Sequence, residues 1–281
     1  MRTIQYSDIV DTVKKMCIDA ARVLPDDVLA RIRQARDDEP FPRARAILGQ
    51  IIENAAIAAS KNIPICQDTG FAVFFIKIGS DVRIDGGNLN DAINEGTRQG
   101  YADGYLRGSI VSDPVFDRKN TSGNTPAMIH TDLVDGDKLE IALLPKGGGC
   151  ENMSGLAMLK PADGVQGIIS FARDCVVNAG GNPCPPTVVG VGVGGTADAA
   201  CILAKKALLR PVGNHNADDR YAKLEADLLD EINASGVGPQ GLGGKHTALW
   251  VSVEYLPCHI ASMPVAVSIN CHAARRAAVI L

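Results

Sequence analysis

The sequence predicts an α+β fold in which helices and strands are mixed and a helical segment comes first. Apolar residues recur every three or four positions in the N-terminal part, whereas short β-rich runs bounded by glycine and proline follow later. The 281 residues are 46% hydrophobic and 21% charged, so the chain can bury a large core. We therefore predict one compact domain over residues 1–281, with a helical segment at 1–62 and a core at 63–281.

The helical segment is expected to hold three helices. The apolar face of the first helix comprises Ile9, Val13, Met16, Cys17, Ala20 and Leu24. Pro25 ends this helix, and a second helix is expected at 26–33. A third helix is expected at 43–60, because Pro64 follows shortly after it and disfavours further helix.

The core is expected to combine strands and helices. Strands are expected at 71–78, 187–191, 247–255 and 265–269, and helices at 90–101, 164–179, 197–209 and 217–233. Gly180 and Gly181 stand where the C-cap of a helix favours glycine. The runs 127–134 and 138–145 flank Asp135-Gly136, and this pattern predicts a β-hairpin.

The charge pattern excludes several classes of protein. The net charge is −4, and no basic stripe with interleaved aromatic residues is present, so nucleic-acid binding is not expected. The N-terminal residues carry several charges and do not form a signal peptide, and apolar runs such as 71–76 are too short to span a bilayer. We expect a soluble, cytoplasmic protein, whose eight cysteines are not a disulfide framework.

Three of the cysteines differ from the rest. Cys66, Cys184 and Cys271 each lie among proline, asparagine or glycine at the boundary of an expected element. Each one alone is as consistent with a structural thiol as with a metal ligand. Together they are too far apart for a local zinc finger, and no CxxC pair is present. Three soft thiolates suit an iron–sulfur cluster that keeps one coordination position open.

The other five cysteines are not interpreted as metal ligands. Cys17, Cys175 and Cys201 lie on expected helices and are interpreted as small buried hydrophobic residues. Cys258 follows a strand, and a core position is favoured for it. Cys150 follows three glycines and is expected to face a pocket, but nothing in its spacing makes it a ligand.

Two glycine runs suggest different roles. Residues 190–195 match GxGxxG, but the second strand and the terminal acid of a dinucleotide site are missing. We therefore expect a tight turn with close helix packing there, or a loop whose amides face Cys184. Gly147, Gly148 and Gly149 allow backbone amides to approach a carboxylate or an oxyanion, although a flexible exit from the hairpin would look the same.

Several polar residues are candidates for binding and proton transfer. Gln67 and Asp68 follow Cys66 directly, so a carboxylate that moves a proton and an amide that orients substrate would lie beside a bound cluster. A simple Asx turn at Asp68 is the alternative. The guanidinium of Arg107 matches a substrate carboxylate, although a lone arginine is usually a surface ion pair. His259 is close in sequence to Cys258.

The motifs together resemble those of a known family, the alpha subunits of class I (iron–sulfur) fumarate hydratase and of its relative L(+)-tartrate dehydratase. The motifs are Ile65–Gly70, Leu106–Ser109 with Asp113-Pro114, Gly147–Asn152, Pro183–Gly195, Gly238–Gly244 and Asn270–Arg276. The resemblance implies that Cys66, Cys184 and Cys271 hold a [4Fe–4S] cluster with one open iron. It further implies that Gln67, Asp68, Arg107 and Gly149 contact a dicarboxylate and that His259 lies near the site. Asp68 is our candidate for proton transfer on this chain.

The resemblance implies the reversible hydration of fumarate to L-malate, with L(+)-tartrate or mesaconate (methylfumarate) as alternative substrates. Glu151-Asn152 and Cys271-His272 are similar to the fumarate hydratase pattern, whereas Cys150 departs toward the tartrate pattern. The resemblance also implies a separate beta subunit and an α2β2-type assembly. An iron–sulfur regulatory protein without catalysis is the alternative from a different class, and a nucleotide-binding oxidoreductase is a third interpretation.

Overall fold

The computed structural model describes residues 1–281, and the chain divides into two compact units. The first unit contains Met1–Leu24, Ala55–Gly148 and Arg275–Leu281, and the second contains Pro25–Asn54 and Gly149–Ala274. Because the chain passes repeatedly from one unit to the other, neither unit is a continuous half of the sequence. The prediction of one domain with an internal boundary at residues 62–63 stays a prediction.

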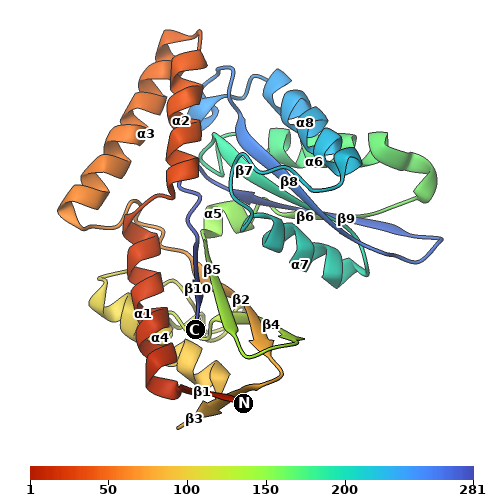
Figure 1. Ribbon diagram of the computed structural model, residues 1–281. Helices are drawn as coiled ribbons and strands as arrows, with labels where there is room; N and C mark the ends of the chain where they lie inside the picture. Colours follow the sequence, from red (N-terminus) through yellow and green to blue (C-terminus); the bar gives the residue numbers. More distant parts are fainter. The chain divides into compact units, whose positions relative to one another are not determined.

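The first unit is built on a four-stranded sheet with the strand order β10-β5-β2-β4. Its strands are β2 (Phe71–Gly79), β4 (Met128–Val134), β5 (Leu139–Lys146) and β10 (Ala277–Ile280), and the short strands β1 (Arg2–Gln5) and β3 (Val82–Asp85) pair separately in parallel. Helices α1 (Tyr6–Arg22) and α4 (Leu89–Asp103) share one apolar core with β2 and β5 (Figure 1). The predicted helices and strands at these positions are confirmed.

The predicted hairpin of residues 127–145 is wrong, because β4 and β5 do not pair with each other. Strand β2 lies between them, parallel to β4 and antiparallel to β5. Backbone oxygens at the Asp135-Gly136 turn bond to the segment that follows β2. Ser80 N donates to Val134 O, and Asp81 N donates to Gly136 O. The apolar β2, buried over most of its length, fits the centre of the sheet better than the mostly exposed β4 does.

Helices α1 and α4 approach each other closely at small residues. A Cβ atom on Gly96 would lie 2.7 Å from Val10 O, and one on Gly100 would lie 2.9 Å from the Cβ of Cys17. Cys17 is buried in this contact, and burial raises the pKa of its thiol to about 12, although a hydrogen bond with Thr97 lowers it. The interpretation of Cys17 as a core residue is confirmed.

The second unit is built on a four-stranded sheet with the strand order β6-β9-β7-β8. Its elements are α2 (Asp26–Asp38), β6 (Gly155–Leu159), α6 (Gly164–Ala179), β7 (Thr187–Gly194), α7 (Ala197–Ala207), α8 (Asp219–Ala234), β8 (Ala248–Leu256) and β9 (Met263–Asn270). Helix α3 (Pro42–Lys61) and the four-residue helix α5 (Gly148–Glu151) run across the boundary between the units. Helices α6 and α8 cover one face of the sheet and α7 covers the other (Figure 1).

Strand β7 explains the GxGxxG pattern as packing. Val189, Val191 and Val193 face the core formed with α6 and α8, whereas Gly190 and Gly192 face α7. A Cβ atom at either glycine would lie only 2.1 Å from a backbone oxygen of α7, that of Ala204 or Ala200. The expectation of close helix packing is therefore confirmed.

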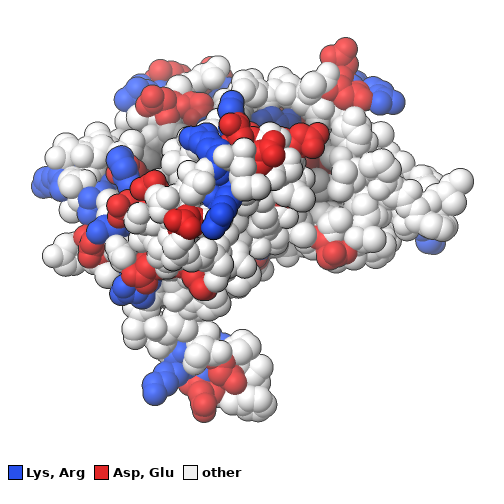
Figure 2. Space-filling model, turned by 60° about the horizontal axis from the view of Figure 1, so that its bottom comes forward, with Lys and Arg blue, Asp and Glu red and all other residues white.

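The surface agrees with the absence of a basic stripe in the sequence. On the face shown in Figure 2, basic and acidic side chains lie intermingled and do not gather by sign. None of the helices is both long enough and apolar enough to cross a bilayer.

Candidate active site

The loop that joins α3 to β2 carries three of the predicted site residues. Cys66, Gln67 and Asp68 follow one another between the end of α3 and Phe71. The Asp68 N–H points at Cys66 Sγ over 3.4 Å, and Cys66 Sγ lies 3.4 Å from Gln67 Oε1. Asp68 Oδ1 accepts a 3.0 Å hydrogen bond from Gly70 N, so Asp68 does form an Asx turn. The turn fixes the loop but leaves Cys66 and Gln67 partly or fully exposed.

The glycine run meets the carboxylate of Asp68. Gly148 N donates to Asp68 Oδ2 over 2.8 Å, and a Cβ atom on Gly147 would lie 3.1 Å from the same oxygen. The sequence predicted that these glycines let an amide approach a carboxylate, and one such carboxylate belongs to the chain itself. Because a carboxylate has about four acceptor positions, Asp68 can still accept a hydrogen bond from a ligand.

A second loop of the first unit brings Arg107 beside this turn. Thr69 Oγ1 accepts a 3.0 Å hydrogen bond from Arg107 N and lies 3.3 Å from Arg107 O, to which it can donate. The Arg107 side chain is exposed, and its guanidinium forms no hydrogen bond or ion pair in the structure. Arg107 can therefore bind a carboxylate without first losing a partner.

Buried polar side chains link the loop that carries Asp68 to the loop that carries Arg107. Tyr101 Oη donates to Gly70 O over 2.8 Å, and Asn124 Nδ2 donates to the same oxygen over 3.1 Å. Asn124 Oδ1 accepts from Ser109 N over 2.8 Å. Burial raises the pKa of Tyr101 well above its usual range, so the phenol stays protonated and remains a donor.

In the second unit, Cys184 and Cys271 lie at the same end of the sheet. Cys184 precedes β7 and Cys271 follows β9, and these strands pair with Val188 opposite Asn270. His272 N donates to Cys184 O over 3.3 Å, which links the two loops directly. Cys184 has a φ of 51°, a left-handed conformation that is uncommon outside glycine. Its side chain is exposed, and that of Cys271 is half-buried.

Gly149 belongs to the surroundings of Cys184. A Cβ atom on Gly149 would lie 3.4 Å from Asn182 O, and the Sγ of the next residue, Cys150, lies 3.6 Å from Pro183 O. Cys150 is buried, and its expected position facing a pocket stays a prediction. Gly149 and Cys150 therefore pack against the loop that carries Cys184.

His259 lies elsewhere in the second unit. It is an exposed residue of the loop between β8 and β9, where its Nδ1 accepts a hydrogen bond from Ala261 N over 3.1 Å. This loop is at the carboxyl end of β7, whereas Cys184 is at the amino end. The 8 residues of β7 span roughly 25 Å. The structure therefore does not bring His259 together with Cys184 and Cys271 within this unit.

The structure thus gathers the predicted residues into two groups, one in each unit. Cys66, Gln67, Asp68 and Arg107 form the first group, and Cys184, Cys271 and Gly149 form the second. No cluster of three His, Cys, Asp or Glu side chains is positioned to hold a metal ion by itself. Two other cysteine predictions are wrong: Cys201 and Cys258 are exposed, Cys201 on α7 and Cys258 in the same loop as His259.

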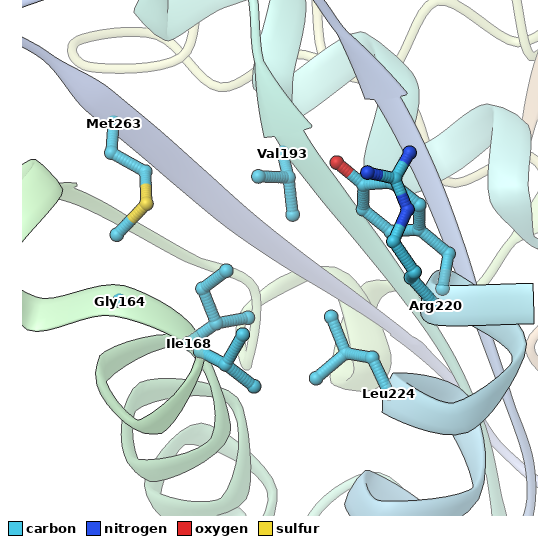
Figure 3. Close-up of a pocket in the computed structure, with 8 residues that line it drawn as sticks. Gly164, Ile168, Val193, Arg220, Leu224 and Met263 are labelled. Atoms are coloured by element: carbon cyan, nitrogen blue, oxygen red, sulfur yellow. The ribbon is translucent and has the colours of Figure 1, made fainter. Parts of the chain in front are cut away.

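A cavity in the second unit is lined by residues of neither group. Its volume is about 320 Å³, and its lining combines the starts of α6, α8 and β9 with the end of β7. Figure 3 shows the apolar side chains of Ile168, Val193, Leu224 and Met263 around it, with Arg220 at one side. Arg220 already pairs with Asp218. None of the predicted site residues lines this cavity.

The sequence did not single out four polar residues that build the first group. Thr69, Tyr101 and Asn124 tie its loops together, and Arg275 Nη2 donates to Asp68 O over 2.8 Å. Thr69 and Arg275 lie inside two of the motifs that carry the family resemblance, and this position in a motif could have marked them as candidates. Tyr101 and Asn124 have no local signal, because their partners are distant in sequence.

Comparison with known proteins extends the similarity to nearly the whole chain. A family model described as Fumarate hydratase (Fumerase) matches residues 10–280. A Methanocaldococcus jannaschii protein, whose name assigns it provisionally as L(+)-tartrate dehydratase subunit alpha, is 43% identical over 273 residues, which cover 96% of this chain and 96% of the relative. The L(+)-tartrate dehydratase subunit alpha of Escherichia coli strain K12 is 33% identical over 255 residues, which cover 90% of this chain and 84% of the relative.

Proposed function

This chain belongs to the fumarate hydratase (Fumerase) family, and from this premise we propose that it is the alpha subunit of a two-subunit hydro-lyase that removes water from L(+)-tartrate. The observation that carries the choice of substrate is the 43% identity, along 96% of both chains, to a relative named as a tartrate dehydratase subunit. Fumarate was the first expectation from the sequence. It becomes the second candidate, supported by the description of the matching family model.

The cysteines support a [4Fe–4S] cluster as the cofactor. Thiolates are the usual ligands of such clusters, and the side chains of Cys66, Cys184 and Cys271 are all at least partly exposed. Cys17 is the opposite case, because burial raises the pKa of its thiol to about 12. We propose that these three exposed or half-buried thiols hold the cluster. When bound, it would supply a Lewis-acidic iron for a substrate hydroxyl and carboxylate.

The residues of the first unit would bind the substrate and move its proton. Arg107 offers an unpaired guanidinium, which binds a carboxylate through two parallel hydrogen bonds. Asp68, held by the N–H groups of Gly70 and Gly148, keeps acceptor capacity at a fixed position and is our candidate for proton transfer. Gln67 would orient the substrate through its amide.

Gly149 would contribute a backbone N–H to the substrate from the side of Cys184. We leave His259 out of this arrangement, because its loop lies at the opposite end of β7 from Cys184. Its contact with substrate stays a prediction.

The relatives are named as alpha subunits, and we propose a separate beta subunit that joins this chain in an α2β2 assembly. The beta subunit would supply the remaining catalytic groups, so the alpha chain alone would have little or no activity.

The proposed function is tested by anaerobic co-expression with candidate beta subunits, followed by turnover measurements on L(+)-tartrate, L-malate and mesaconate. We expect the complex to convert L(+)-tartrate fastest and the alpha chain alone to be inactive. Fastest turnover of L-malate would select the second candidate. A cluster-loaded complex that converts none of the three would instead support a regulatory protein without catalysis.

A further inference from the structure

Arg275 is a buried cation directly beneath the loop that carries Cys66 and Asp68. Its side chain is 3% exposed, and it belongs to the first unit, just before β10. Its Nη2 donates to Asp68 O over 2.8 Å. The charge of Arg275 also acts on the nearby phenol of Tyr101, which itself bonds to Thr69 O and Gly70 O. Arg275 and Tyr101 therefore lie near each other and bond to backbone oxygens of the same loop.

The rest of the guanidinium is unusual for a purely structural residue. Its Nε and Nη1 are buried and have no hydrogen-bond partner, and no carboxylate forms an ion pair with it. A buried charge destabilises a fold unless a counter-charge and hydrogen bonds compensate for it. Since the chain supplies only one hydrogen bond, stability alone does not account for a cation at this position.

The bond to Asp68 O controls the orientation of several groups at once. The same residue directs its N–H at Cys66 Sγ and its carboxylate at the N–H groups of Gly70 and Gly148. A hydrogen bond from a charged donor is stronger than one from a neutral donor. Loss of this bond would therefore loosen the turn that places Cys66 and Asp68 relative to each other.

We propose that Arg275 is the positioning residue of the Cys66–Gly70 loop, and that its uncompensated charge is matched by the negative charge that develops on the dicarboxylate in the transition state. Arg275 acts on the chemistry through Asp68 and through its positive field, without direct contact with the substrate. The catalytic half of this proposal rests on the proposed function, whereas the loop-positioning half does not.

The test compares Arg275→Gln with Arg276→Gln, a matched control that removes the same charge from the next residue. Hydrogen exchange of the full chain reports on the loop amides, including those of Gly70 and Gly148. We expect exchange there to become at least ~10-fold faster in Arg275→Gln, a change of about 1.4 kcal/mol, and to stay unchanged in the control. In the two-subunit complex, kcat should fall at least ~10-fold, with KM within about threefold and with the same visible cluster spectrum.

Arg275→Lys provides the conservative variant, because an ammonium group can still donate to Asp68 O. It should recover slow exchange and part of the turnover. If Arg275→Gln does not fold, Arg275→Lys replaces it in both measurements. Unchanged exchange in Arg275→Gln, or equal acceleration in Arg276→Gln, would overturn the positioning role. A rise in KM with kcat unchanged would overturn it as well, since that pattern marks direct substrate binding. If the wild-type complex proves inactive, the proposed function fails, while the exchange measurement still decides the role of Arg275 in the loop.

Discussion

Two loops of this molecule each present a proposed ligand thiol, and they are held in different ways. The Cys66–Gly70 loop is tied down by side chains, namely those of Asp68, Thr69, Tyr101, Asn124 and Arg275. The Cys184 loop is held largely by backbone groups: Cys184 N donates to Gly181 O, His272 N donates to Cys184 O and Gln240 N donates to Pro185 O. The geometry of the first loop therefore depends on residue identity, whereas that of the second depends on the path of the chain.

This difference separates two tasks. Side chains that can bind and move protons are concentrated around the first loop, in Gln67, Asp68 and Arg107. The second loop offers thiols and backbone groups. We infer that substitutions in the first loop change catalysis while the cofactor stays bound, and that the second loop serves mainly to hold the cofactor.

The largest effect on turnover is expected from the cysteine thiols, because both loops are proposed to hold the cluster through them. Cys66→Ala and Cys184→Ala should each abolish the visible absorbance of the cluster and lower turnover by at least ~100-fold, because an activating metal contributes several kcal/mol to the transition state. Cys201→Ala is the matched control, since its thiol is exposed but lies in neither loop. Wild-type absorbance in either of the first two variants would remove that cysteine from the ligand set.

Asp68→Asn should separate catalysis from cofactor binding. General acid–base catalysis contributes ~100- to 10,000-fold, so kcat should fall within that range while the cluster spectrum is retained. The amide can keep one of the two backbone N–H bonds, and the loss of the other should cost about 1 kcal/mol of unfolding free energy. Turnover within twofold of wild type would show that Asp68 is only a turn residue.

Arg107→Ala tests binding at the edge of the first loop. A charged hydrogen bond contributes ~1.5–3 kcal/mol, so KM should rise ~10- to 100-fold, whereas the free energy of unfolding should stay nearly constant because the side chain has no partner to lose. Arg118→Ala is a suitable control, since Arg118 is an exposed arginine that bonds only to Pro114 O in the same unit. An equal rise in KM in both variants would indicate a general charge effect.

The smallest effect on turnover is expected from Thr69→Val, which keeps the shape of the side chain but removes its bonds to Arg107. The free energy of unfolding should fall by ~1–2 kcal/mol, because the Arg107 N–H loses its partner. KM should rise only a fewfold, and chemical denaturation with steady-state kinetics measures both. If KM rose as much as in Arg107→Ala, Thr69 would itself contact the substrate.

The sequence predicted most of the helices because their apolar periodicity is long and regular, as in α1 and α6. It missed β1, β3, β6 and β10, which have four or five residues each and offer too few positions for a pattern to show. The hairpin prediction failed because local turn chemistry at Asp135-Gly136 gave no information about β2, which inserts between the two strands.

The residues of the candidate site that lie in short sequence motifs could be predicted. Cys66 stood out because turn residues flank it, Asp68 because it follows Cys66, and Arg107 because its guanidinium matches a carboxylate. The structure places all three in adjoining loops. Arg275 and Tyr101 were not predictable in their roles, since each acts on a loop that is remote in sequence. His259 stays a prediction: its nearness to Cys258 in sequence gave no information about which end of the sheet its loop occupies, and the loop lies at the carboxyl end of β7.

The most direct test of the account is cluster content and L(+)-tartrate turnover, measured on the same anaerobic preparation of the two-subunit complex. The account predicts one [4Fe–4S] cluster per alpha chain, lost on substitution of Cys66, Cys184 or Cys271, and turnover that disappears together with the cluster. A complex that turns over L(+)-tartrate at the wild-type rate after any of these three substitutions would contradict it.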